Sequence, residues 1–405
     1  MTFEKYTSQT VERHDMSPVS RRRVLQTVSG LVAGLAGCSL VPGESSSMPV
    51  PTAWTNDVRR PSPGAGIDGR PLVVGRASPW SDEECLLGID PSSGDKQWSV
   101  PAEGDEGSSA VAHDGSTAFS YTTTGKVRAV DAADGTVGWE VDTGGWDFRR
   151  PEVRLSAPLV VDDVVVIPAS WPGYDGADHD HRLLAFDAES GDNLWRYSLS
   201  APLSGTPAAS DGAVVLPRTD GVIEAVDATG EGLWRTERSD RFESASATDG
   251  RAFVGTAGER FDVFDLANGE HRWGFETENA VLTPPHLVDG VVYVGSADYR
   301  LYAVDAASGE ELWRSETANA VTSGPVKVDD ALVSVVGGLN NGPFRDRRYH
   351  YEPEAVYVHD AANGDVRGEF VYDEGSPQWV QNIDGAVYIG HERGLVKLSG
   401  GALDD

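Results

Sequence analysis

One pattern of apolar, polar and turn-forming residues recurs along the chain at intervals of about 40 residues. Its clearest copy is Leu301–Trp313, LYAVDAASGEELW, in which an apolar run ends in Asp, Gly follows, and Trp stands in a more polar run. Short apolar runs bounded by turn residues predict β-strands, and each copy holds four of them. The Asp of the pattern occurs at Asp90, Asp131, Asp187, Asp227, Asp265, Asp305 and Asp360.

The residues between these runs are the types that tight turns require. The Asp of the repeated phrase is expected to cap the next turn with its carboxylate, and the following Gly to supply a left-handed backbone. Asp-Gly pairs favour two-residue hairpin turns in which both residues have positive φ. We expect such hairpins at Asp114-Gly115, Asp211-Gly212, Asp249-Gly250, Asp289-Gly290 and Asp384-Gly385.

Four antiparallel strands in each repeat predict the blades of a β-propeller. Seven full copies are followed by an incomplete one that starts at Trp379 and ends at Leu398, without an outer strand. Residues 52–58, which contain Trp54, supply a strand of the missing kind. We therefore expect an all-β, eight-bladed β-propeller of four-stranded antiparallel blades over residues 52–400, closed by an N-terminal strand, with residues 401–405 as a tail.

The phrase Ala-x-Asp-x-x-x-Gly-x-x-x-Trp resembles the tryptophan-docking repeat of the quinoprotein (pyrroloquinoline-quinone-like) β-propeller superfamily, and the resemblance covers residues 52–400. Within it the chain is most similar to the non-enzymatic, lipid-anchored barrel-assembly lipoproteins. This resemblance implies a scaffold that binds a protein or another extracellular ligand, without a cofactor. Enzymes of the superfamily use an adjacent cysteine pair and a calcium site, whereas the two cysteines here are Cys38 and Cys85.

Two other functions remain as alternatives to the scaffold. One is a quinoprotein-type dehydrogenase that uses pyrroloquinoline quinone and calcium. The other is an extracellular carbohydrate-binding module, with Trp146, Trp171, Tyr174 and Tyr351 as stacking platforms. Because function must be argued from a site rather than from a fold, the repeats alone do not choose among the three.

The first 51 residues are expected to be a targeting signal followed by a flexible tether. Arg21 and Arg22 precede an apolar run in the manner of a twin-arginine export signal. The run ends at Leu35-Ala36-Gly37-Cys38, which matches a lipobox, so residues 1–37 are expected to be removed and Cys38 to be lipidated. Residues 38–51 then form a flexible tether. We expect a monomer, held by this anchor on the outer side of the cytoplasmic membrane.

The charge balance is strongly acidic: 64 Asp and Glu stand against 33 Lys and Arg, a net charge of −31. After the predicted signal, Lys occurs only at Lys96, Lys126, Lys327 and Lys397. Such a Lys-poor, acidic composition is similar to that of proteins from salt-in halophiles, archaea among them, because molar salt screens self-repulsion. The same charge argues against nucleic acid as a partner.

Three links are longer than their counterparts in other repeats and are expected to rise from one face of the ring. They comprise residues 146–154, 171–181 and 340–351. Exposed aromatic and arginine side chains favour interfaces, so we predict a binding face there. It comprises Trp146, Phe148, Arg149, Trp171, Tyr174, His179, His181, Arg345, Arg347, Arg348 and Tyr351, with Trp379 near the same rim. Asp178, His179 and His181 are metal-capable donors, but their spacing matches no established zinc site.

Overall fold

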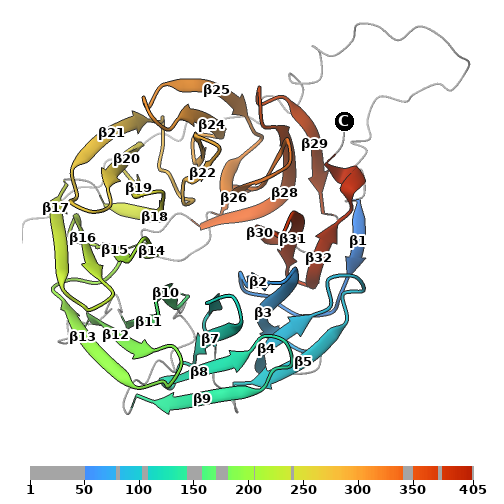
Figure 1. The fold of residues 1–405 in the computed structure, drawn as a ribbon. Helices are drawn as coiled ribbons and strands as arrows, with labels where there is room; N and C mark the ends of the chain where they lie inside the picture. The colour runs from blue at the N-terminus through green and yellow to red at the C-terminus, as the bar shows by residue number, and fades with distance from the viewer. Residues whose placement is uncertain are drawn as a thin grey trace, which may run out of the picture. The chain divides into compact units, whose positions relative to one another are not determined.

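The computed structural model describes residues 51–78, 83–102, 108–143, 157–169, 181–204, 206–238, 241–340, 350–372 and 376–403. These residues form eight four-stranded antiparallel sheets arranged in a ring (Figure 1). The prediction of an all-β, eight-bladed β-propeller is confirmed. By its contacts the chain divides into Met1–Ser46, which lies outside the described residues, and Ser47–Asp405. The described part contains no helix with the length and apolar character that crossing a bilayer requires.

The blades are numbered 1 to 8 from the one that contains β2, and their strands are counted outward from the centre of the ring. The innermost strands are β2 (Ala65–Ile67), β6 (Ala112–His113), β10 (Leu159–Val161), β14 (Ala208–Ser210), β18 (Phe242–Thr248), β22 (His286–Val288), β26 (Ala320–Val328) and β30 (Pro377–Ile383). The second strands are β3 (Arg70–Arg76), β7 (Thr117–Tyr121), β11 (Val164–Ala169), β15 (Ala213–Pro217), β19 (Arg251–Thr256), β23 (Val291–Ser296), β27 (Ala331–Asn340) and β31 (Ala386–His391).

The third strands are β4 (Glu84–Ile89), β8 (Lys126–Asp131), β12 (His181–Asp187), β16 (Val222–Asp227), β20 (Arg260–Asp265), β24 (Arg300–Asp305), β28 (His350–Asp360) and β32 (Gly394–Leu398). The outermost strands are β5 (Lys96–Pro101), β9 (Val137–Asp142), β13 (Asn193–Leu199), β17 (Gly232–Glu237), β21 (His271–Glu276), β25 (Glu311–Glu316), β29 (Val366–Val371) and β1 (Thr52–Thr55). Second and third strands are buried on both faces between blades, whereas in β25 and its counterparts only every other side chain turns inward.

Most hairpins between first and second strands are two-residue turns, and four of the five predicted Asp-Gly turns are among them. Their Asp residues have positive φ at Asp68, Asp162, Asp211, Asp249, Asp289, Asp329 and Asp384. At Asp114-Gly115 the prediction is wrong, because Ser116 adds a third residue to the loop and only Gly115 has positive φ. There the Asp114 carboxylate accepts hydrogen bonds from the N–H groups of Ser116 and Thr117 at 2.9 and 2.8 Å.

The outer-strand tryptophans join each blade to the next. Trp98 donates its indole N–H to the carbonyl of Ala132 at 3.2 Å, and a Cβ on Gly135 would lie 2.8 Å from the Trp98 ring. Gly135 also has a φ of 79°, so both its backbone and its neighbour require glycine. The same contact is made by Trp54, Trp139, Trp195, Trp234, Trp273 and Trp313.

The N-terminal strand closes the ring at what we call the seam, the junction of blades 8 and 1. Strand β1 pairs with β32, with Trp54 opposite Lys397 and Thr55 opposite Val396. Trp54 then donates to the carbonyl of Pro91 in blade 1 at 3.0 Å. The expected closure is confirmed, although Trp54 is half-buried rather than fully buried.

Gly368 stands in blade 7 where the other blades carry the docking tryptophan, and the closure explains why. Each tryptophan docks on the turn between the third and fourth strands of the next blade. Blade 8 has no such turn, because its fourth strand comes from the N-terminus. Instead Phe370 lies beside Gly368, and Leu403 packs on the same core cluster after a 3-10 turn at Gly400–Ala402. The packed body therefore extends through Leu403.

Candidate functional site

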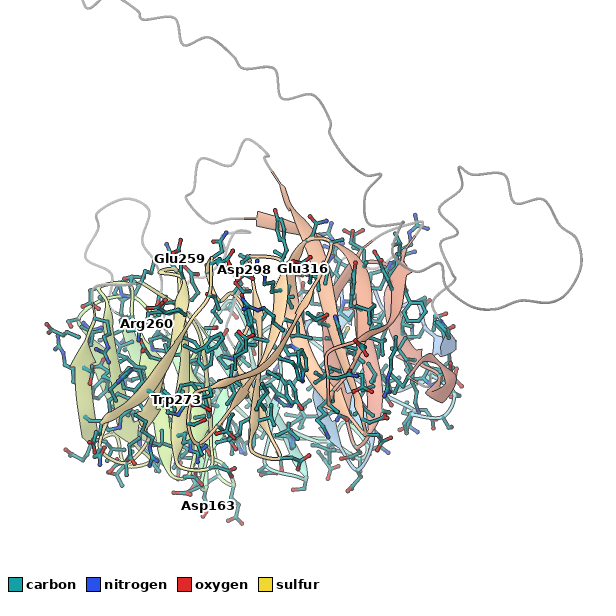
Figure 2. The ribbon with its side chains drawn as sticks, turned by 90° about the horizontal axis from the view of Figure 1, so that it is seen from above. Asp163, Glu259, Arg260, Trp273, Asp298 and Glu316 are labelled. Carbon is teal, nitrogen blue, oxygen red and sulfur yellow. The ribbon has the colours of Figure 1, made fainter. Side chains whose placement is uncertain are left out.

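The antiparallel order of the strands divides the links between two faces of the propeller. Links between second and third strands and links between blades emerge on one face, called here the insertion face because the three predicted insertions belong to it. The hairpins between first and second strands and the turns between third and fourth strands emerge on the other, called the turn face. In Figure 2, Glu259 and Asp298 of the insertion face lie at the upper edge, and Asp163 of the turn face lies at the lower edge.

The turn face repeats the same local chemistry from blade to blade. In blade 6 the Asp305 carboxylate accepts hydrogen bonds from the backbone N–H groups of Ala307 and Ser308 at 3.1 and 2.8 Å. Equivalent bonds hold Asp90, Asp187, Asp227, Asp265 and Asp360. In blade 1 the Ser92 hydroxyl and N–H are the main groups that lower the pKa of Asp90 to about 2. These aspartates are ionised turn caps, as predicted.

Most residues of the predicted binding face lie outside the described residues: Trp146, Phe148, Arg149, Trp171, Tyr174, His179, Arg345, Arg347 and Arg348. The metal candidate Asp178 lies outside them too. The strands that flank them, β9 and β10, β11 and β12, and β27 and β28, meet these links on the insertion face. Blades 3 and 7, which carry two of the links, stand opposite each other in the ring (Figure 1). The binding role of these residues stays a prediction.

The link in blade 7 is shorter than the sequence suggests, because both of its ends are paired strand. Strands β27 and β28 continue past the blade body, with Asn340 opposite His350 and Leu339 opposite Tyr351. The range 340–351, expected to be loop, therefore begins and ends in a β-ribbon. Figure 2 shows this ribbon rising above the level of Glu259 and Asp298.

Trp379 does not belong to an exposed surface. Its side chain is 5% exposed and packs with Val58 and Tyr388 in the core cluster at the seam. Its indole N–H donates to the carbonyl of Pro61 at 2.6 Å. Because it is enclosed between blades 8 and 1, the prediction that it contributes to the binding face is wrong. The prediction was based on the position of Trp379 at the start of an innermost strand. That position does not show whether a neighbouring blade covers the side chain.

Two further residues named in the sequence analysis, Cys85 and His181, have clear surroundings. Cys85 is 5% exposed in the same core cluster, where burial raises the pKa of its thiol. His181 is the first residue of β12, opposite Leu199, at the insertion face. Among the described residues no three His, Cys, Asp or Glu side chains gather as a metal site would require.

Sequence reasoning missed a basic pocket on the insertion face at the seam. It is an open pocket of about 390 Å³, lined by Arg59, Arg60, Arg76, Glu392 and Arg393, and is called here the arginine pocket. Four arginines and one glutamate line it, in a chain whose net charge is −31. Arg59 and Arg60 form no ion pair with the residues that the structure describes, and Arg59 Nε has no hydrogen-bond acceptor.

The backbone around the arginine pocket is firmly held. Arg59 and Arg76 exchange backbone hydrogen bonds of 2.9 and 3.0 Å, which ties the linker after β1 to blade 1. Arg60 donates its N–H to the carbonyl of Glu392 in blade 8 at 3.4 Å. Arg60 also has a φ of 48°, a left-handed conformation that few residues other than glycine adopt. The linker thus forms backbone hydrogen bonds with both blades of the seam. These bonds fix the backbone positions of Arg59 and Arg60.

Blades 5 and 6 carry the opposite charge on the same face. Four exposed glutamates, and one aspartate whose side chain is 3% exposed, form what we call the acidic arc: Glu259, Glu276, Glu278, Asp298 and Glu316. Figure 2 labels Glu259, Asp298 and Glu316. Its cations are neutralised locally, because Arg300 pairs with Glu278 at 2.7 Å and Arg260 pairs with Asp262. Asp298 accepts hydrogen bonds from the Tyr302 hydroxyl at 2.6 Å and from the N–H of Glu278 at 2.9 Å.

Comparison with known proteins assigns the family. The family model described as outer membrane protein assembly factor BamB matches residues 82–176, 176–245 and 219–376, most of the propeller. The chain belongs to this family. It is 29% identical over 120 residues to BamB of Nitrosomonas eutropha, which covers 28% of each chain. It is 28% identical over 227 residues to BamB of Bordetella pertussis, which covers 51% of this chain and 53% of that one.

The chain thus spans about half or less of the length of these curated relatives. A quinohemoprotein alcohol dehydrogenase of Pseudomonas putida is 39% identical over 75 residues, 18% of this chain and 10% of that one. BamB from Moraxella catarrhalis shares the fold, with a TM-score of 0.62 at 18% identity over 86% of this chain and 98% of that one. Sqt1 of Saccharomyces cerevisiae also shares it, with a TM-score of 0.64 at 12% identity over 86% and 98%.

Proposed function

We propose that this protein is a non-enzymatic, lipid-anchored scaffold that binds a partner protein through its insertion face. The observation that carries the proposal is the contrast between the faces of a BamB-family propeller. Its turn face repeats one hydrogen-bonded turn, whereas its insertion face differs from blade to blade in length and charge. A surface that every repeat shares suits solvent, and a surface that differs suits recognition of one partner.

The anchor in this proposal rests on the sequence of the first 51 residues. Arg21 and Arg22 direct export of the folded chain, and a lipid on Cys38 holds the propeller at the outer side of the cytoplasmic membrane. Replacing both arginines with lysine should leave the protein in the cytoplasm. Cys38→Ser should release it from washed membranes, and unchanged membrane association of Cys38→Ser would contradict the anchor.

The residues present do not fit the cofactor of the quinoprotein dehydrogenases. Neither cysteine of the chain has a cysteine beside it, and the described residues contain no cluster of three metal-capable side chains. The aspartates of the repeats are already committed to turn capping. Titration of the purified protein with pyrroloquinoline quinone and calcium, followed by absorbance, should therefore show no saturable complex. A stoichiometric complex would favour the dehydrogenase instead.

Recovery of the partner from native membranes tests the scaffold directly. The tagged full chain is used as bait in high salt, beside a Trp171→Ala and an Arg347→Ala variant. Binding energy concentrates in a few large side chains, so each variant should lose more than about 1 kcal/mol of affinity for the recovered protein. The control carries Asp163→Asn and Asp249→Asn on the turn face and should bind as the parent does. Loss in the control with retention in both loop variants would place the site on the wrong face.

A further inference from the structure

The geometry points to the arginine pocket as the site that takes an acidic segment of the partner polypeptide. This inference rests on the proposed scaffold function and adds the chemistry of the contact. A cluster of guanidinium groups recognises carboxylates, since planar N–H donors match carboxylate oxygens in pairs. Four arginines line the opening of this pocket.

Arg59 and Arg60 are not neutralised by ion pairs with described residues of the propeller. Arg218 of blade 4 differs from them. It follows the second strand of its blade on the insertion face, is 1% exposed, and donates hydrogen bonds to Glu224 at 3.0 Å and to the Ser200 hydroxyl at 2.5 Å. No described carboxylate forms an ion pair with Arg59 or Arg60. Arg59 helps to lower the pKa of Asp57, but the Asp57 carboxylate already pairs with Lys96 at 2.5 Å. Because Arg59 and Arg60 form no ion pair with a described residue, their guanidinium groups at this open pocket suit an anion that arrives from outside.

The pocket is also prepared for binding. Both blades of the seam hold the linker through backbone hydrogen bonds, so little chain ordering is left to the moment of binding. Asn56 adds to this, because its side-chain oxygen accepts hydrogen bonds from the N–H groups of Val58 and Leu395 at 3.2 and 3.1 Å. Preorganisation of this kind raises affinity by lowering the entropic cost of association.

Size and asymmetry favour a peptide over a small ion. A volume of about 390 Å³ lies in the range of pockets that hold whole ligands, and a phosphate or sulfate fills only part of it. The carboxylate of Glu392 at the same rim repels a compact anion but accepts a peptide N–H or a basic side chain. A segment with two or more acidic side chains satisfies both features.

The test measures binding of a fluorescein-labelled hexaglutamate peptide to the full chain by fluorescence anisotropy in 1 M KCl. At that salt the Debye length is about 3 Å, so only direct contacts contribute. The pocket variant is Arg59→Gln with Arg60→Gln. The matched control is Arg235→Gln with Arg314→Gln, which removes the same charge from side chains 51% and 54% exposed on outer strands. A hexaglutamine peptide and inorganic phosphate complete the set.

The inference predicts saturable binding to the parent, at least tenfold weaker binding to the pocket variant, and less than a twofold change in the control. Hexaglutamine should not bind. Equal losses in both variants, or no binding to the parent, would overturn it. Displacement by phosphate at the concentration of the peptide would also overturn it, in favour of a small-anion site.

The same variants in the membrane recovery experiment separate the two proposals. A partner recovered equally by the parent and the pocket variant refutes the arginine pocket and leaves the scaffold standing. Recovery of no partner by any form refutes the scaffold, while the peptide titration still decides whether the pocket binds acidic segments.

Discussion

Blades 5 and 6 and the seam between blades 8 and 1 lie on one face and treat their charges in opposite ways. In blades 5 and 6 the arginines are neutralised by acids close by in the chain, such as Arg260 by Asp262. At the seam, Arg59 and Arg60 lie on a linker that belongs to no repeat, and no described carboxylate pairs with them. The repeats thus carry their own counter-charges, whereas the closure of the ring creates a position where a charge is available for another molecule.

The largest expected effect comes from an arginine inside the repeats. Arg218→Gln should destabilise the fold by about 3 kcal/mol, because Glu224, whose side chain is 7% exposed, would lose its buried partner. Denaturant unfolding with Arg235→Gln as the exposed control measures this difference. A cost no larger than that of Arg235→Gln would mean that the buried ion pair of Arg218 does not stabilise the fold.

The docking tryptophans give the second effect and separate the seam from the other blade junctions. Trp54→Ala and Trp273→Ala should each cost about 2–3 kcal/mol, since both side chains are half-buried and both indole N–H groups are bonded to the next blade. Only Trp54→Ala should also weaken binding of the acidic peptide, because it loosens the strand that leads into the arginine pocket. Equal peptide binding by the two variants would show that the arginine pocket does not depend on the closing strand.

Acid should act on blade 7, next to the seam, through a buried histidine. His359 is fully buried without a hydrogen-bond partner, and desolvation lowers its pKa from 6.5 to about 4. Between these values the unfolded chain binds more protons, so stability falls as pH falls from about 6.5 to 4. From pH 7.5 to 4.5 the parent should lose about 2–3 kcal/mol more than His359→Leu, measured by urea unfolding. Parallel curves for the two proteins would exclude this histidine as the cause.

The smallest effect on stability is expected at the arginine pocket. Arg60→Gln should change the free energy of unfolding by less than about 0.5 kcal/mol, because the side chain is exposed and forms no ion pair. A loss comparable to that of Arg218→Gln would show that Arg60 serves the fold and would remove the contrast between the two regions.

The repeats made most of the fold predictable. The period and the Trp54 strand led to eight blades and to the place of closure, because one short-range pattern recurs in every blade. The hairpin at Asp114 escaped prediction because one additional residue, Ser116, changes the turn type. Trp379 was misplaced because strand alternation does not reveal which blade covers a side chain at the seam.

For the candidate site, the sequence predicted only which face of the propeller carries it. The arginine pocket combines the linker at Arg59 and Arg60 with Arg76 of blade 1 and Arg393 of blade 8, residues that only ring closure brings together. No motif spans such a separation, so the pocket became visible only with the structure. The linker after the closing strand was its one available signal, since that segment carries two adjacent arginines in an acidic chain.

Site-specific photocrosslinking in native membranes tests the central claim most directly. A photoreactive residue is placed at Arg60 in the arginine pocket, and in a second protein at Asp163, exposed on the turn face (Figure 2). We predict a crosslinked partner at position 60, joined through an acidic segment that mass spectrometry identifies, and none at position 163. A partner crosslinked at position 163 and absent at position 60 would contradict both the face and the pocket.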